Sequence, residues 1–506
     1  MSTEDLSSFL SNCNEYKTIP IVKTIVGDTL TPIQIFQNLE QEASFILESK
    51  DEQSLWSHYS FIGLSPFLFV DEINGEFIIK NGNQQKIAKK STLKKAFAWI
   101  QEHLAVMDVD LPIPFTGGAV GYIGYDAIST FEKVNEHQNN DMNIKRYHFF
   151  FCETLLAFNH HKKELSIIHY ISLNGDEDTR CKKAVFEHAL AKINIYLTKI
   201  LQNNKHQELV PLHNMKAEVS FDDIKSNYEK EMFIRDVTKI KDYIAAGDIF
   251  QAVLSQRFEV PVSISGFELY RVLRMVNPSP YLFYIKSDDV EIIGSSPERL
   301  INIQEDHLEI HPIAGTRRRG RTPEEDELLA QELLHDEKEK AEHYMLVDLA
   351  RNDIGRVSKF GTVNTPVLME LGRFSHVMHL ISKVTGVISE TVDPIDALLA
   401  AFPAGTVSGA PKIRAMQILS ELEPTARNLY AGTIAYIGFD GNIDSCITIR
   451  TIVLKDGVGF IQAGAGIVAD SVPELEWKET LNKASALIKT IELAHKMFAG
   501  KEGQYV

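Results

Sequence analysis

Cysteine is scarce in this sequence, which has only four among its 506 residues. Cys13, Cys152, Cys181 and Cys446 are far apart and form no CxxC pair. That spacing excludes a disulfide framework and the common zinc-binding motifs. We therefore expect a reduced, cytoplasmic protein without structural zinc.

Long hydrophobic runs and a surplus of basic residues are also missing. No apolar run approaches the ~20 residues of a membrane span, and the first residues, MSTEDLSSFL, lack the pattern of a signal peptide. The 52 Lys and Arg against 69 Asp and Glu give a formal net charge of −17. Because nucleic acids and anionic membranes require a basic face, neither is expected as a partner.

The order of patterns along the chain predicts two regions. Residues 18–200 alternate short apolar β-type runs with turns and helical patterns. Residues 201–224 are mostly polar and poorly periodic, which is typical of a linker. Residues 225–490 again mix both element types, and their longest helical pattern runs from about 323 to 353. Because strands and helices are mixed rather than strictly alternating, we predict an α+β fold with a two-lobed, sandwich-like core of mixed or antiparallel sheets flanked by helices.

Two segments resemble one another. GGAVGYIGYD at 117–126 and AGTIAYIGFD at 431–440 match in register at five positions. The match indicates either two similar strand–turn units or a pseudo-repeated pair of strands in a two-lobed sheet.

Arginines gather in HPIAGTRRRGR, at 311–321, in an otherwise acidic chain. Such a cluster is either a solvated loop or an anion site, because arginine forks suit carboxylates and phosphates. Arg450 lies among β-branched residues in SCITIRTIVL. We expect it to be largely buried, so that it requires an anionic partner.

Glycines and carboxylates supply further candidate positions. Gly464 and Gly466 in AGAGIVAD resemble a dinucleotide motif, but too little chain follows for a complete βαβ unit, so binding of a carboxylate by backbone amides fits better. Glu339 and Glu342 are three residues apart on one predicted helix, as are Glu476 and Glu479 on another. These pairs are either solvated helix faces or, if the helices meet, oxygen ligands of the kind that Mg²⁺ takes.

Three more motifs carry side chains that could act in catalysis or could have an ordinary structural role. FPAGTVSGAPK, at 402–412, is a tight loop that contains Thr406. His379 lies among apolar residues, where a satisfied core histidine is common, and Glu298 precedes Arg299, with which it could form a structural ion pair.

Eight motifs in order give the sequence a clear resemblance: GDIFQAVLSQRF, NPSPYLFY, GSSPERL, PIAGTRRRGR, AEHYMLVDLARNDIGRV, FPAGTVSGAPK, CITIRT and QAGAGIVADSVPELEWKET. The sequence resembles the chorismate-utilising enzymes, and among them the large subunits of anthranilate synthase. The resemblance is dense over 225–490, and the FILES and YSFIG segments extend it toward the N-terminus. It implies the chorismate-utilising fold and amination of chorismate at C2, followed by loss of pyruvate.

The resemblance also implies a role for each matching residue. Chorismate and its carboxylates would be held by Gly315, Thr316, Tyr430, Arg450, Gly464, Ala465 and Gly466. Glu342 and Glu479 would bind Mg²⁺, with Glu339 and Glu476 beside them, and Glu298 would be the general acid for the departing C4 hydroxyl. His379 and Thr406 match active-site positions whose roles stay open.

Two positions distinguish members of the family. Gln251 stands where isochorismate and salicylate synthases have a lysine base, and an amide does not deprotonate water. Ala314 stands where aminodeoxychorismate synthases commonly have the lysine of PIKGT. Both residues favour direct attack by ammonia at C2. The alternatives are aminodeoxychorismate synthase component I and a non-catalytic tryptophan-binding or scaffolding homologue.

Regulation and partners follow from the same resemblance. Glu48 and Ser49, together with Pro280, Tyr281 and Leu282, resemble the family's site for feedback inhibition by L-tryptophan, although ordinary packing would also explain them. None of the four cysteines lies in a glycine-rich nucleophile motif. We therefore expect ammonia from a separate glutamine amidotransferase subunit in a hetero-oligomer.

Overall fold

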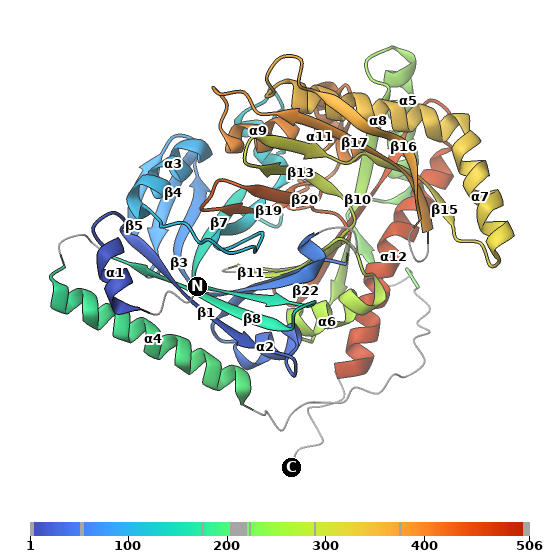
Figure 1. Cartoon of the computed structure of the whole chain (residues 1–506). Coiled ribbons are helices and arrows are strands. Elements are labelled where there is room, and N and C mark those ends of the chain that lie inside the picture. The colour runs from blue at the N-terminus through green and yellow to red at the C-terminus, as the bar shows by residue number, and fades with distance from the viewer. Residues whose placement is uncertain are drawn as a thin grey trace.

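The computed structural model describes residues 5–50, 55–173, 177–202, 220–221, 224–287, 290–373 and 377–498. Within these ranges every pairing between named strands is antiparallel, and helices cover the outer faces of the sheets (Figure 1). The predicted α+β fold with a sandwich-like core is confirmed. No helix among the described residues is long and apolar enough to cross a membrane.

Two series of paired strands, called here the first and second sheets, share the long strands β3 (Tyr59–Ile73) and β7 (Tyr147–Asn159). The first sheet adds β1 (Thr18–Val26), β2 (Ala43–Glu48), β8 (Glu164–Ser172), β9 (Lys225–Ser226), β10 (Gln251–Pro261), β11 (Tyr281–Lys286), β12 (Glu291–Ser296), β18 (Gly409–Ala410), β21 (Thr451–Lys455) and β22 (Val458–Ile467). The second adds β4 (Glu76–Asn81), β5 (Lys86–Lys90), β6 (Gly118–Ile123), β13 (Arg299–Gln304), β14 (His307–Ile310), β15 (Ile313–Arg318), β16 (Asn364–Arg373), β17 (Val377–Val387), β19 (Thr433–Gly438) and β20 (Ile443–Ile447).

A bulge explains how β3 serves both sheets. Its register with β7 shifts between Pro66 and Leu68, next to Ser65, whose φ is 53°. Such irregularities let a strand turn from one sheet of a sandwich into the other. Phe45 and Phe283 of the first sheet share one buried cluster with Tyr436 of the second, so the core lies between the sheets.

The helices pack on the outside of this sandwich. One buried cluster joins the first sheet to α1 (Leu6–Asn12), α2 (Pro32–Asn38), α4 (Thr179–Leu201), α6 (Gly266–Val276) and α12 (Pro473–Phe498). Another joins the second sheet to α3 (Leu93–Leu104), η2 (Tyr125–Thr130), α8 (Glu337–Gly355) and α9 (Pro394–Ala401). The remaining helices are η1 (Leu55–His58), α5 (Lys230–Ala245), α7 (Pro323–His335), α10 (Gly405–Ser408) and α11 (Lys412–Leu422).

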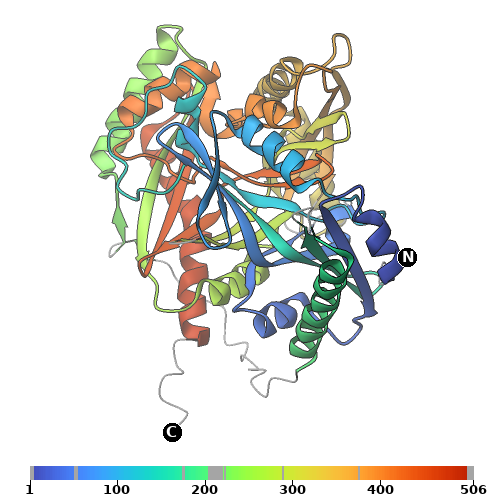
Figure 2. The same ribbon diagram turned by 90° about the vertical axis from the view of Figure 1, so that its left-hand side faces the viewer.

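The two similar segments of the sequence lie side by side. They form β6 and β19, which pair with each other from Gly118↔Gly438 to Ile123↔Thr433. β2 and β11 also join the N-terminal and C-terminal parts of the chain. Figures 1 and 2 accordingly show N-terminal and C-terminal strands interleaved at the centre of the molecule. The division at 201–224 stays a prediction: α4 ends at Leu201, and 203–219 and 222–223 lie outside the described residues.

The prediction of one helix from 323 to 353 is wrong. The structure has two helices, α7 and α8, separated at Asp336, whose ψ of 105° is not helical. The Asp336 carboxylate accepts hydrogen bonds from the amides of Lys338 and Glu339 and so caps α8. Leu328 of α7 is 72% exposed, so the apolar residues of the predicted helix do not form one continuous buried face.

Candidate active site

The candidate site begins where the chain passes between the two sheets. Glu298 lies between β12 and β13, and Arg450 lies between β20 and β21. The two crossings are hydrogen-bonded together: the Ile447 amide donates to the Glu298 carbonyl at 3.0 Å, and the Ser295 amide donates to the Arg450 carbonyl at 3.1 Å. Neighbouring crossings thus hold the general-acid candidate and an arginine beside one another.

Glu298 has an environment suited to a proton donor. Desolvation raises the pKa of its carboxyl to about 7, although hydrogen bonding by Thr406 and the charges of Arg450 and Lys483 act in the opposite direction. The Thr406 hydroxyl is itself buried beside this carboxyl. A carboxyl that is half protonated near neutral pH is what general acid catalysis requires.

The expectation that Arg450 is buried is wrong. The strand ends at Ile447, and Arg450 follows in a turn with a φ of 49° and an exposed side chain. The surrounding protein still desolvates the guanidinium and lowers its pKa, while the charge of Glu298 acts to raise it. Arg450 therefore stands as a cation beside Glu298, available to an anionic ligand.

One face of β22 forms a second part of the site. A methyl group added to Gly464 would come within 2.7 Å of the Tyr430 hydroxyl, and one added to Gly466 within 2.6 Å of the Gln251 Nε2. A larger residue at either position would displace the neighbouring side chain, because these two side chains lie directly against the backbone. The side chain of Ala465 faces the other way, into the core beneath α5 and α11.

Lys483 was missed by the sequence reasoning. Its Nζ donates to the Gly464 carbonyl at 2.9 Å and lies 2.8 Å from Glu479, one turn earlier on α12. Because the Gly464 carbonyl faces Lys483 and not β10, the Gly464 amide faces the same side, toward the site. The only signal in the sequence was the i, i+4 spacing from Glu479, which is common on solvated helices.

Gly315, Thr316 and His379 form a third part of the site. Gly315 has a φ of 67° at a register shift between β15 and β17, a conformation that favours glycine. The His379 Nδ1 lies 2.8 Å from the Gly315 carbonyl and 3.2 Å from the Thr316 hydroxyl. Desolvation lowers the pKa of His379, so the ring is neutral near pH 7 and donates from Nδ1 to the carbonyl. The charge of Arg450 contributes to this shift, which connects this part of the site to Glu298.

Two acidic pairs from α8 and α12 meet at the edge of the site. Desolvation raises the pKa of Glu342, and the charges of Glu339 and Glu479 add to it. Desolvation also raises the pKa of Glu476, with Glu479 again contributing. Among the described residues, no three His, Cys, Asp or Glu side chains are already arranged around a metal position. Mutual repulsion between oxygen donors is nevertheless the chemistry that a hydrated divalent cation relieves, so the residues fit Mg²⁺.

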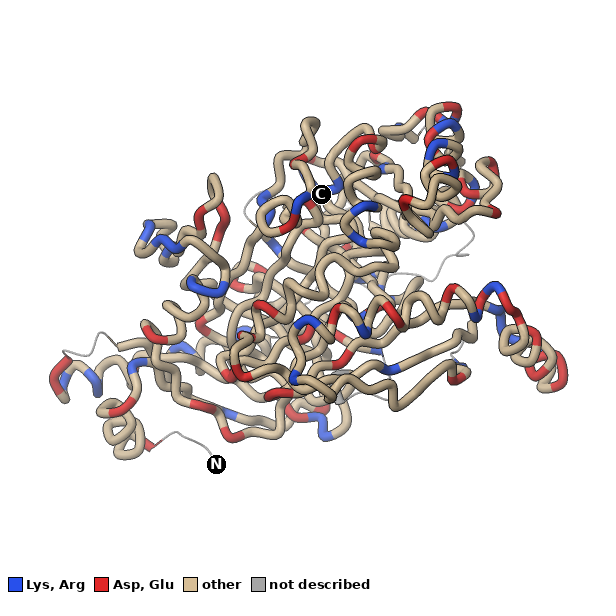
Figure 3. The backbone as a smooth tube through the Cα atoms, turned by 90° about the horizontal axis from the view of Figure 1, so that it is seen from above, with Lys and Arg blue, Asp and Glu red and all other residues tan. Residues whose placement is uncertain are grey.

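The arginine cluster binds carboxylates of the protein itself. Arg317 pairs with Glu332, Asp336 and Glu339, at 2.9, 2.8 and 3.2 Å. Arg318 pairs with Glu325, and Arg319 with Asp326. These pairs attach α7 and the start of α8 to β15. Figure 3 shows acidic and basic residues interspersed over the molecule in the same way.

The predicted tryptophan-site residues lie where β2 and β11 pair: Leu282 is buried, whereas Ser49, Pro280 and Tyr281 are half-buried. Leu282 of β11 is opposite Glu48 of β2 in the ladder, and Ser49 follows directly. The Glu48 carboxylate accepts hydrogen bonds from Ser60, Tyr270 and Arg274.

Tyr281 completes this group. Its hydroxyl donates to Asp444 at 3.1 Å and accepts from Arg299 at 2.8 Å. Since Arg299 adjoins Glu298, this region is one residue along the chain from the general-acid candidate. Pro280 directly precedes β11.

Comparison with known proteins places this geometry in a family. A family model described as "chorismate binding enzyme" matches residues 42–489. Anthranilate synthase component 1 of Geobacillus stearothermophilus is 60% identical over 506 residues, which are 99% of each chain. The chain therefore belongs to the chorismate binding enzymes, and within them to the anthranilate synthase component 1 enzymes.

Solved structures agree with this assignment. Anthranilate synthase component I from Streptococcus pneumoniae TIGR4 has 35% identity and a TM-score of 0.71, and the match covers 92% of this chain and 98% of that one. The menaquinone-specific isochorismate synthase from Escherichia coli has a TM-score of 0.67 over 96% of this chain and 98% of its own. At 17% identity, that second match shows the shared fold alone.

Proposed function

We propose that this enzyme converts chorismate to anthranilate, by amination at C2 with ammonia and elimination of pyruvate, as in the first step of tryptophan biosynthesis. The observation that carries the proposal is Glu298, a carboxyl with a pKa raised to about 7 and influenced by Thr406, Arg450 and Lys483. A proton donor within the electrostatic influence of two cations suits a substrate with two carboxylates and a hydroxyl that must leave.

Substrate binding would use cations and backbone amides. Arg450 and Lys483 supply positive charge, and the amides of Gly464 and Gly466 face the same side of β22. The Tyr430 hydroxyl, whose pKa is raised to about 12 by burial, remains protonated and can donate a hydrogen bond. Gly315 and Thr316 would contact the ligand from β15.

The first step transfers a proton and forms a bond to nitrogen. Glu298 donates its proton to the C4 hydroxyl, which leaves as water while ammonia bonds to C2 and both ring double bonds shift, from C1=C2 to C1=C6 and from C5=C6 to C4=C5. Gln251 offers an amide that does not deprotonate water, and Ala314 offers no nucleophile, so ammonia attacks C2 directly. Release of a proton from the new ammonium group gives the 2-amino intermediate. Loss of the C2 hydrogen and of the enolpyruvyl group as pyruvate then yields anthranilate.

A divalent cation completes the proposed site. Glu342 and Glu479 would hold Mg²⁺, with Glu339 and Glu476 as neighbours, and the ion would neutralise the ring carboxylate of the substrate. Without the cation, these glutamates would repel the carboxylates of chorismate.

Ammonia supply and regulation complete the proposal. A separate glutamine amidotransferase subunit would deliver ammonia within a hetero-oligomer, and this chain alone would use free ammonia. L-Tryptophan would inhibit from the region of Ser49, Pro280, Tyr281 and Leu282, where β2 and β11 pair. Arg299 donates to the Tyr281 hydroxyl and adjoins Glu298 in the chain. Tryptophan bound in that region would therefore act on the catalytic acid through one neighbouring residue.

A single incubation tests this function. Purified chain, chorismate, Mg²⁺ and an ammonium salt should give anthranilate fluorescence and an equal amount of pyruvate, whereas glutamine should not replace ammonium. A 4-aminated product would instead identify an aminodeoxychorismate synthase, which Ala314 disfavours. Isochorismate would contradict the assignment of Gln251, and the absence of any product would support the scaffolding alternative.

A further inference from the structure

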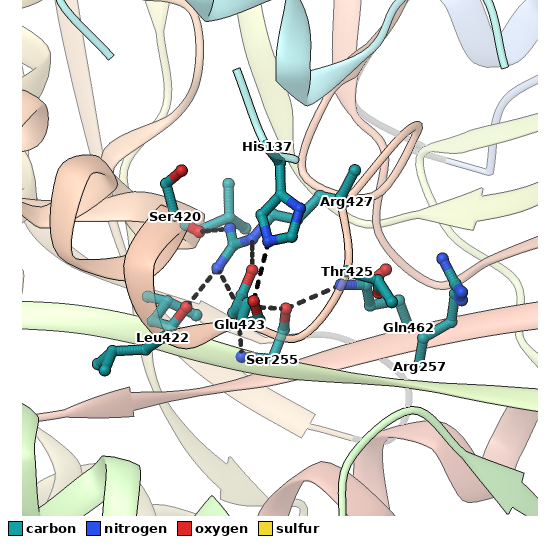
Figure 4. A network of polar contacts seen from close by, with 12 residues as sticks. His137, Ser255, Arg257, Ser420, Leu422, Glu423, Thr425, Arg427 and Gln462 are labelled. Atoms are coloured by element: carbon teal, nitrogen blue, oxygen red, sulfur yellow. Dashed lines mark hydrogen bonds and ion pairs between the residues drawn. The ribbon is translucent and has the colours of Figure 1, made fainter. Parts of the chain in front are cut away.

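The sequence indicated a buried arginine at Arg450, whereas the structure buries Arg427. Arg427 follows α11 and is 3% exposed, and its ion-pair partner Glu423 is 7% exposed. The guanidinium binds the carboxylate in a bidentate manner: Nε donates to Oε2 and Nη2 donates to Oε1, both at 2.7 Å (Figure 4). Neither residue was singled out by a motif, because buried ion pairs leave no periodic pattern.

The remaining donors of Arg427 reach two segments of the candidate site. Its Nη2 donates to the Val253 carbonyl at 2.6 Å, and its Nη1 donates to the Val407 carbonyl at 2.8 Å. Val253 is two residues beyond Gln251 and pairs with Gly466. Val407 directly follows Thr406.

A third segment is held by stacking and a backbone hydrogen bond. The guanidinium lies over the Tyr430 ring, 5.5 Å from its centroid, and over the Tyr125 ring at 4.5 Å. The Tyr430 amide donates to the Arg427 carbonyl at 3.0 Å. One side chain therefore contacts all three segments that carry Gln251, Thr406 and Tyr430.

Glu423 is fixed in turn by β10 and β22. Its Oε1 accepts from the Ser255 amide at 2.9 Å and from the Ser255 hydroxyl at 2.7 Å. Gln462 donates to that hydroxyl at 2.9 Å (Figure 4). Both carboxylate oxygens of Glu423 and all three guanidinium nitrogens of Arg427 have hydrogen-bond partners, so the ion pair is held in one orientation. A rigid ion pair of this kind suits a residue that sets the position of others.

We propose that Arg427, oriented by Glu423, is the positioning residue of the active site: it sets the relative placement of Gln251, Thr406 and Tyr430 around the substrate without contacting the substrate. This inference rests on the proposed function. A lysine has one compact ammonium group and does not reproduce the side-on fork together with two carbonyl contacts. A charge-conserving substitution therefore separates geometry from net charge.

The matched control is Arg257, another buried arginine of the same strand as Val253. It is 2% exposed and pairs with Asp141, with its guanidinium over the Phe460 ring. Among the described residues its side chain pairs with Asp141 and Phe460, and none of Gln251, Thr406 and Tyr430 is a hydrogen-bond, ion-pair or ring partner. Arg427→Lys and Arg257→Lys thus make the same chemical change at comparable depth.

The experiment compares steady-state kinetics and thermal unfolding of the full chain with chorismate, Mg²⁺ and ammonium. Because misplacement by about 1 Å can cost about a hundredfold, we expect Arg427→Lys to lower kcat/KM for chorismate at least about tenfold, mainly through kcat. Arg257→Lys, with a similar drop in Tm, should stay within about threefold of the wild type. Equal kinetic losses in the two variants, or an unchanged Arg427→Lys enzyme, would overturn the proposal.

A milder variant keeps the test decisive if Arg427→Lys does not fold. Ser255→Ala removes one hydrogen bond to the Glu423 carboxylate and should lower kcat about threefold or more, because the group that orients Arg427 loses one of its donors. An unchanged kcat in a folded Ser255→Ala enzyme counts against the inference. A wild type that forms no anthranilate refutes the proposed function itself, whereas an active wild type with insensitive variants refutes only the role of Arg427.

Discussion

The amide of Gln251 lies so close to Gly466 that a methyl group on that glycine would sit 2.6 Å from Nε2. Gln251 begins β10 and Gly466 is near the end of β22, and the two strands pair through Val253↔Gly466. The glycine is therefore needed for the position of a neighbouring side chain. The Tyr430 hydroxyl has the same relationship to Gly464, two residues earlier.

Gly466→Ala is expected to displace the Gln251 amide and to lower kcat/KM about ten- to a hundredfold while the protein stays folded. Gly355→Ala is the control, because a methyl group there meets no atom within 4 Å at the end of α8. Steady-state kinetics and circular dichroism on both variants check this. Full activity of Gly466→Ala would show that the contact has no catalytic importance.

Glu298→Gln is expected to lower kcat by about 10² to 10⁴, because an amide cannot donate the proton that the leaving hydroxyl requires. In the wild type, the acid form of Glu298 predominates below its pKa of about 7 and is lost as the pH rises through that value. The rate with free ammonia, corrected for the ammonia fraction, should therefore fall above pH 7. A flat profile from pH 6 to 9 would exclude Glu298 as the acid.

Gln251→Lys is expected to change the reaction and not merely to slow it. A lysine at this position would lie against Gly466, on the strand whose Gly464 carbonyl accepts from Lys483, and a neighbouring positive charge lowers the pKa of an amine and favours its base form. Water attack at C2 should then compete with ammonia, and chromatography should detect isochorismate that the wild type does not make. Gln251→Met, which lacks any base, should not form it.

Removal of Mg²⁺ is expected to abolish anthranilate formation reversibly, and binding should also be visible without turnover. Mg²⁺ should raise the Tm of the wild type but not of Glu342→Gln. Since the pKa of Glu342 is raised, its charged form destabilises the metal-free fold above that pKa, and this cost disappears on protonation. Metal-free Glu342→Gln should therefore be more stable than the wild type above the raised pKa of Glu342, and the difference should shrink as the pH falls through that pKa.

Ser49→Leu is expected to weaken inhibition by L-tryptophan at least about tenfold, or about 1.4 kcal/mol, while kcat without inhibitor is unchanged. The residue follows Glu48 at the β2–β11 ladder, away from the contacts of Glu298 and Gly466. Calorimetric titration with tryptophan gives the affinity directly. Unaltered affinity would remove Ser49 from the inhibitor site.

Much of the fold was readable from local patterns. The predicted helices that carry Glu342 and Glu479 appear as α8 and α12, because apolar periodicity is a short-range signal. The break at Asp336 was missed because a single capping aspartate looks like any helical carboxylate until its ψ is known. The burial of Arg450 was misjudged for a related reason, since β-branched residues do not reveal where a strand ends.

The candidate site divides in the same way. The sequence by itself determined which chemical groups are present, from Glu298 and Gln251 to the glycines of β22, because ordered motifs record side-chain identity. Only the tertiary structure decided how these groups are related. The pKa of Glu298 is raised because the carboxyl is buried at a crossing between the sheets, and Lys483 reaches the Gly464 carbonyl because α12 packs beside β22. The proposed role of Arg427 depends on contacts with three segments that only the fold brings together. Desolvation and contact arise from packing residues that are far apart in the chain, and no local pattern encodes them.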